Sequence, residues 1–155
     1  GVVAFPTSRE ADRPFARALA EGRVEKTYVA LVRRPATGRL PARLEGSVDG
    51  GDTPPRPAVT DVRIVEALGG VLVVEARPRP GRKHQIRIHL ARAGAPLLGD
   101  VRYGGPAQVA GVAVPRVMLH ARRLALAHPV TGAPLAIEAA LPPDLTGLLA
   151  RLRGA

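Results

Sequence analysis

Two pairs of β-rich segments, each pair joined by a short turn, constrain the fold of this chain more than any other feature. Residues 59–67 and 71–76 are rich in Val and Ala and flank a Leu-Gly-Gly turn, and residues 119–127 and 135–141 flank a turn with two prolines. Segments of this kind, separated by turns that contain Gly or Pro, are typical of β-hairpins. The sequence therefore predicts a sheet in which neighbouring strands run antiparallel.

Other apolar runs add to this sheet. Residues 1–5 predict a buried strand, and residues 24–32, with apolar side chains at both parities towards their end, predict a strand that is covered on both faces. Residues 34–57 are dense in Gly and Pro, so we expect a loop there with at most a weak strand.

Three segments have helical character. The first helix is expected to begin at Thr7, with Thr7 and Glu10 as a capping box, or at Asp12. A second is expected over residues 81–94, and a third from Pro142 with its leucines on one side. Strands joined mainly by hairpins, with helices between them, predict an α+β fold: a largely antiparallel mixed sheet with flanking helices in one domain over residues 1–155.

Composition limits the kinds of function. The 155 residues are 46% hydrophobic, which is enough for one buried core, and they include no cysteine, so thiolate metal sites are excluded. No apolar run is long enough to cross a bilayer, and we expect a cytoplasmic protein. The net charge of +10 favours a polyanionic partner, and nucleic acid is the common one.

The segment from Gly81 to Leu90 carries the most unusual side chains. Lys83, His84, Gln85, Arg87 and His89 fall within two helical turns. Two histidines five residues apart point about 140° apart on a helix, so they cannot share one metal ion, and we expect no metal. Taken alone, the segment is compatible with an exposed basic helix as well as with a functional site.

The same segment, Gly-Arg-Lys-His-Gln-Ile-Arg, resembles a motif of RluA-type RNA pseudouridine synthases. The resemblance covers almost the whole chain, in family order. It continues through Lys26-Thr-Tyr28, Ala58-Val-Thr60, Leu97-Leu-Gly-Asp100 and Leu119-His-Ala121. We therefore expect the pseudouridine synthase catalytic-domain fold, in part.

The resemblance implies a reaction that requires no cofactor and no metal. The C1′–N1 bond of a uridine within ribosomal or transfer RNA is broken, the uracil rotates, and a C1′–C5 bond is formed. By position, Arg87 corresponds to the arginine that pairs with a nucleophilic aspartate, Tyr28 to the tyrosine against the uracil, and Leu119 to a nearby aliphatic side chain. A guanidinium would help to keep a carboxylate ionised in a partly dry cavity. Tyr28 and Leu119 are also compatible with ordinary packing roles.

The basic and polar residues of these motifs are the expected RNA contacts: Lys26, Arg82, Lys83, His84 and Gln85. Lys83 and Pro80 stand where the family commonly has Thr, and neither carries one of the proposed catalytic roles. We expect RNA as the partner, no membrane, and a monomer.

The family's nucleophile belongs to a motif whose final glycine matches Gly1, which places the aspartate five residues before this chain. We therefore expect a catalytic domain that is truncated at its N-terminus and inactive alone. Asp100 is the only acidic residue within the matched motifs that could substitute, and its family position indicates a structural role. The alternative to an isomerase is a non-catalytic basic RNA-binding module on the same scaffold.

Overall fold

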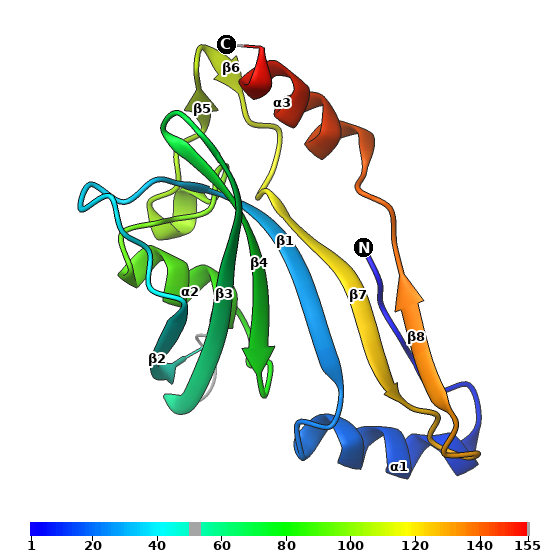
Figure 1. The fold of residues 1–155 in the computed structure, drawn as a ribbon. Helices are drawn as coiled ribbons and strands as arrows, with labels where there is room; N and C mark the ends of the chain where they lie inside the picture. The colour runs from blue at the N-terminus through cyan, green and yellow to red at the C-terminus, as the bar shows by residue number, and fades with distance from the viewer. Residues whose placement is uncertain (50–53, 155) are drawn as a thin grey trace.

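A six-stranded antiparallel sheet forms the centre of the molecule in the computed structural model, which describes residues 1–49 and 54–154 (Figure 1). The strand order is β2-β3-β4-β1-β7-β8. The strands are β1 (Glu25–Arg33), β2 (Arg43–Val48), β3 (Arg56–Leu68), β4 (Val71–Arg79), β7 (Leu119–Ala127) and β8 (Pro134–Glu138). The expected α+β class, the two hairpins and the central strand are thereby confirmed.

Three α-helices flank the sheet, namely α1 (Arg9–Ala20), α2 (Gln85–Arg92) and α3 (Pro143–Arg153). A 3₁₀ turn η1 (Val101–Tyr103) and a small hairpin of β5 (Gln108–Val109) and β6 (Val112–Ala113) complete the described elements. In the part of the chain that the structure describes, every helix is too short or too polar to cross a lipid bilayer.

The alternation of side chains along β1 assigns its residues to two cores, because successive residues of a strand point to opposite faces. Val29 and Leu31 pack with Leu145, Leu148 and Leu149 of α3. The alternate residues belong to the other core, which contains Ala30, Val32, Ile86 and Leu90, with Tyr28 packed against it. Tyr28 therefore lies on the α2 face of the sheet.

The expectation of a buried strand at residues 1–5 is wrong. This segment is irregular: Val2 N–H donates to the Ala121 carbonyl at 2.8 Å, and Phe5 is 78% exposed. One edge of β7 pairs with β1, and the other is occupied by β8 from Arg123 onward, so the segment can reach β7 only near Ala121.

Two helix boundaries also differ from the sequence prediction. α1 is capped by Ser8, whose hydroxyl accepts from Ala11 N–H at 3.2 Å, and not by Thr7 or Asp12. α2 begins at Gln85 and not at residue 81, because His84 takes a left-handed conformation at φ 56°. Residues 81–84 precede the helix and end in a turn in which the Gln85 N–H donates to the Arg82 carbonyl at 3.1 Å. This segment, called the basic turn below, carries Arg82 and Lys83.

The weak strand expected within residues 34–57 is a full member of the sheet. All six residues of β2 pair with β3, from Arg43 opposite Asp61 to Val48 opposite Arg56. Leu44 and Val48 are buried, so the strand has the alternating pattern of a half-buried edge. Residues 50–53, which fall within the expected loop, lie outside the described residues.

Candidate active site

A cavity of about 180 Å³ lies where α2 and the basic turn meet the sheet. The three catalytic candidates come from three separate segments of its wall: Tyr28 from β1, Arg87 from α2, and Leu119 from the start of β7. All three catalytic candidates therefore line one cavity, as do four of the five expected RNA-contacting residues. The complete lining is Lys26, Tyr28, Pro78, Gly81, Arg82, His84, Gln85, Ile86, Arg87 and Leu119.

Arg87 is held by a two-pronged ion pair with Asp100. Its Nε and Nη2 donate to the two carboxylate oxygens at 2.7 and 2.6 Å, and the side chains are 20% and 1% exposed. Hydrogen bonding to Asp100 raises the pKa of Arg87, which keeps the guanidinium charged. This use of one edge of the guanidinium leaves its Nη1 hydrogens for another acceptor.

Tyr103 supports the same arginine from a second side. The Arg87 guanidinium carbon lies 4.9 Å from the centre of the Tyr103 ring, within the range of a cation–π contact. The Tyr103 hydroxyl is 3.0 Å from His84 Nδ1. Burial, followed by the positive charges of Arg87, Arg102 and Lys83, lowers the pKa of His84, which favours the neutral ring. When its Nδ1 carries no hydrogen, this nitrogen can accept a hydrogen bond from the Tyr103 hydroxyl. The His84 ring is therefore engaged by Tyr103 of the same chain at the edge of the cavity.

Gln85 does not present its amide to the cavity, although its residue borders it. The side chain is 2% exposed, and its Oε1 accepts the backbone N–H groups of Gly81 and Arg82 at 3.2 and 2.8 Å. Its Nε2 donates to the Val59 carbonyl at 2.7 Å and to Thr60 Oγ1 at 3.2 Å. The amide is engaged inside the protein on both sides, so the expectation that it contacts RNA does not fit this geometry.

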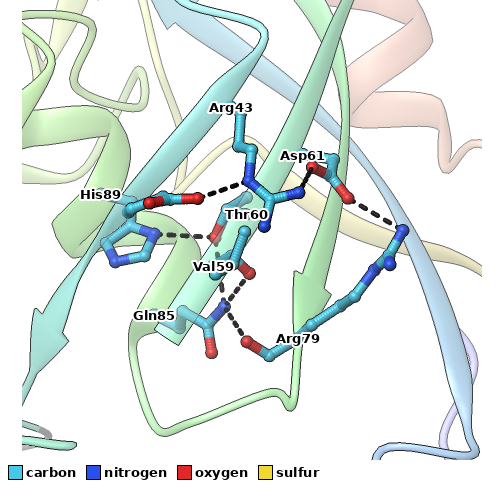
Figure 2. Close-up of polar contacts among 8 residues, drawn as sticks. Arg43, Val59, Thr60, Asp61, Arg79, Gln85 and His89 are labelled. Atoms are coloured by element: carbon cyan, nitrogen blue, oxygen red, sulfur yellow. Dashed lines mark hydrogen bonds and ion pairs between the residues drawn. The ribbon is translucent and has the colours of Figure 1, made fainter. Parts of the chain in front are cut away.

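The hydrogen-bond chain continues from Gln85 into the core, as Figure 2 shows. Thr60 Oγ1 lies 2.9 Å from His89 Nδ1, and His89 Nε2 lies 3.4 Å from the Gly46 carbonyl. Burial lowers the pKa of His89, which favours the neutral ring. If the His89 proton is assigned to Nε2, all three hydrogen bonds run in the same direction. Gln85 then donates to Thr60, Thr60 donates to His89, and His89 donates to the Gly46 carbonyl. The basic turn is thereby tied through α2 to β3 and β2.

Tyr28 and Lys26 occupy alternate positions of β1 on this face. Burial raises the pKa of Tyr28, so its phenol is neutral at ordinary pH, and burial lowers the pKa of Lys26. Arg82 and Lys83 are exposed on the basic turn, and Lys83 is the one expected RNA contact outside the cavity lining.

The sequence pattern did not assign Asp100 to Arg87, nor did it give a role to Thr60, Tyr103 or His89. The available signal was the presence of polar residues at positions where a plain core would have apolar ones. Among the described residues, no group of three or more His, Cys, Asp or Glu side chains is placed to hold a metal ion.

Residues 1–92 match the family model described as RNA pseudouridylate synthase. The chain is 34% identical to tRNA pseudouridine synthase C of Salmonella typhi, over 91% of this chain and 64% of that protein. It is also 34% identical to ribosomal large subunit pseudouridine synthase D of Nitrosomonas europaea, over 99% of this chain and 48% of that protein. The chain thus spans about half to two thirds of the length of these relatives.

Solved structures give the same fold. Human RNA pseudouridylate synthase domain containing 4 aligns with a TM-score of 0.75 at 22% identity, over 94% of this chain and 69% of that one. Human RNA pseudouridylate synthase domain containing 1 aligns with a TM-score of 0.66 at 26% identity, over 96% and 74%.

Proposed function

The chain belongs to the RNA pseudouridylate synthase family, and from that premise we propose that it is catalytic-domain sequence of an enzyme that isomerises uridines within RNA to pseudouridine. The observation that carries this proposal is the convergence of Tyr28, Arg87 and Leu119 on one cavity from three distant parts of the sequence. A surface that only bound RNA would need basic residues, but it would not need a partly buried arginine, already paired with Asp100, in the wall of a cavity beside a tyrosine.

Each residue has a role that its surroundings support. The free edge of Arg87 would pair with the nucleophilic carboxylate, while Asp100 and Tyr103 hold the other sides of the guanidinium. Tyr28 offers a flat ring to an extruded base and a neutral hydroxyl that could take part in proton transfer at C5. Leu119 would exclude water, so that the freed uracil re-forms a bond to C1′ and the sugar is not hydrolysed.

The nucleophile itself is proposed to come from the segment that the family places before Gly1. Among the described residues that line the cavity there is no carboxylic acid. Gly1 borders an adjoining hollow of about 780 Å³ together with Tyr28 and Leu119. An aspartate five residues earlier is therefore within the reach of an extended chain, roughly 17 Å. We propose that residues 1–155 alone make no pseudouridine.

RNA binding is proposed for the cationic side of the same site, formed by Lys26, Arg82, Lys83 and His84, whereas Gln85 is proposed to position the basic turn. The named relatives act on transfer RNA and on large-subunit ribosomal RNA, and we propose a substrate in one of these two classes. We also propose that the protein acts in the cytoplasm as a monomer, without metal or other cofactor.

The test compares residues 1–155 with the natural gene product extended upstream through the expected aspartate. Each is expressed in cells that lack the corresponding gene, and pseudouridine in transfer and ribosomal RNA is counted by mass spectrometry. We expect pseudouridine from the extended protein only. Activity of the short chain would contradict the upstream nucleophile, and inactivity of both with intact RNA binding would favour the non-catalytic module.

A further inference from the structure

Lys26 holds its ammonium group in an unusual place for a lysine. The side chain is half-buried between the active-site cavity and a second cavity of about 220 Å³ bordered by Pro78 and Arg79. A Cβ atom added to Gly81 would lie 3.0 Å from Lys26 Nζ, and Gly81 has φ +101°. The ammonium therefore lies against the backbone of the basic turn, in space that the glycine leaves open.

The charge of Lys26 has no counterpart among the residues that the structure describes: no hydrogen bond or ion pair joins its Nζ to any of them. Neighbouring cations differ in this respect, since Arg79 pairs with Asp61 at 2.9 Å and Arg87 with Asp100. Burial lowers the pKa of Lys26 without an opposing favourable interaction. A cation that is partly removed from water without a partner costs stability, so its position favours an external anion.

The backbone donors of the basic turn next to Lys26 and the charge of Arg87 are already engaged within the protein. The backbone N–H groups of Gly81 and Arg82 both donate to Gln85 Oε1. The charge of Arg87 is matched by Asp100. Among the described residues that line the cavity, Lys26 and Arg82 carry the positive charges without an acidic partner. The Arg82 side chain is exposed, whereas the Lys26 ammonium lies against the backbone of Gly81.

We infer that Lys26 binds a backbone phosphate of the nucleotide whose base enters the cavity. A nucleotide that is turned out of a strand brings the phosphates on either side of its sugar with it, so a phosphate arrives next to the base site. The compact ammonium of lysine suits a single phosphate as a point charge. This inference rests on the proposed function, because it takes RNA as the ligand.

The experiment measures binding, so that it does not depend on turnover. The probe is a fluorescent single-stranded oligonucleotide with one uridine among adenosines, and its affinity is measured between 50 and 200 mM salt. A neutral methylphosphonate is placed at the linkage before the uridine, after it, or four nucleotides away. The proteins are the wild type, Lys26→Met, Lys26→Arg, and Arg151→Met as a control on α3, which packs on the opposite face of the sheet.

We expect Lys26→Met to weaken binding roughly tenfold at low salt and to reduce the slope of log affinity against log salt by about 0.7, the value for one phosphate on a single strand. One neutral linkage beside the uridine should weaken the wild type by a similar factor but leave Lys26→Met unchanged, which is the signature of a direct pair. Lys26→Arg should keep most of the affinity, and Arg151→Met should retain the uridine-adjacent effect.

Thermal melting of each variant shows whether a loss of affinity comes from a loss of folded protein. Because Lys26→Met removes an unpaired, half-buried charge, its melting temperature should equal or exceed that of the wild type. Additive losses from Lys26→Met and every neutral linkage would overturn the phosphate inference while leaving the proposed function in place. The opposite result is also distinguishable. If the neutral linkage beside the uridine weakens only the wild type, but the upstream-extended protein makes no pseudouridine, the phosphate inference holds and the proposed function fails.

Discussion

Replacing Asp100 by Asn should destabilise the folded chain far more than the same change at Asp144. Both aspartates form two-pronged pairs with an arginine, Asp100 with Arg87 at 2.7 and 2.6 Å and Asp144 with Arg116 at 2.6 and 3.0 Å. Their burial differs: the Arg87 and Asp100 side chains are 20% and 1% exposed, and those of Arg116 and Asp144 are 39% and 34% exposed.

The burial decides the magnitude. In Asp100→Asn the new amide can offer one oxygen to the guanidinium but turns its NH₂ group towards donors, which leaves Arg87 charged and only partly satisfied. Breaking a buried pair in this way costs about 3–5 kcal/mol, a large part of the 5–15 kcal/mol of stability that is typical of a domain. An exposed pair contributes about 0.2–1 kcal/mol, so Asp144→Asn serves as the matched control.

The assay is urea unfolding at pH 7.5, followed by circular dichroism, with melting temperatures as a second measure. Asp100→Asn should lower the melting temperature by roughly 6–20 °C, and the double variant Arg87→Met/Asp100→Asn should recover part of the loss because no unpaired charge remains. Equal losses from Asp100→Asn and Asp144→Asn would refute the reasoning, since burial would then not govern the strength of the pair.

Three further predictions concern the cavity and the hydrogen-bond chain behind it. In the extended protein, Tyr28→Phe should keep RNA affinity but stall after cleavage of the C1′–N1 bond, because the hydroxyl moves the C5 proton; quenched-flow product analysis and a binding assay measure the two effects. Parallel loss of binding and turnover would show that Tyr28 only shapes the fold. Thr60→Val should cost about 1–3 kcal/mol, because His89 loses its donor and the Gln85 amide loses an acceptor, whereas Thr60→Ser, compared by urea unfolding, should cost clearly less. Burial lowers the pKa of His89 in the folded chain, so as the pH falls through about 6.5 the unfolded chain is protonated first and the free energy of unfolding decreases. His89→Asn should make this decrease smaller between pH 7.5 and 5.5. The pKa of His84 is lowered too, so His84 should account for part of the decrease that remains.

Patterns with a short range in the sequence predicted most of the fold. Two segments rich in Val and Ala on either side of a Leu-Gly-Gly turn were enough for the β3–β4 hairpin, because a hairpin is set by its turn and its two strands. Residues 1–5 were misread because the pattern cannot show which sheet edge is free: β8 already covers much of the outer edge of β7. The start of α2 was misplaced because it depends on one left-handed residue, His84.

The site was predictable to the extent that it follows motif positions. The motif placed Arg87, Tyr28 and Leu119 together, and they line one cavity. It could not show that Gln85 turns inward or that Arg87 is held by Asp100, since these contacts join β3, α2 and the loop after α2 across the core. Polar residues that are buried in pairs have no periodic signature, so their partners are found only in three dimensions.

The most direct test of the central claim follows the hydrogen at C5 of uridine, which must leave when C5 becomes bonded to C1′. RNA transcribed with tritium at C5 of every uridine is incubated with the upstream-extended protein, as wild type and as Arg87→Lys, and released tritium is measured together with RNA affinity. The account predicts release by the wild type and little by Arg87→Lys at similar affinity, because an ammonium cannot pair with Asp100 and the nucleophile through a planar fork. Release by Arg87→Lys at the rate of the wild type would contradict it.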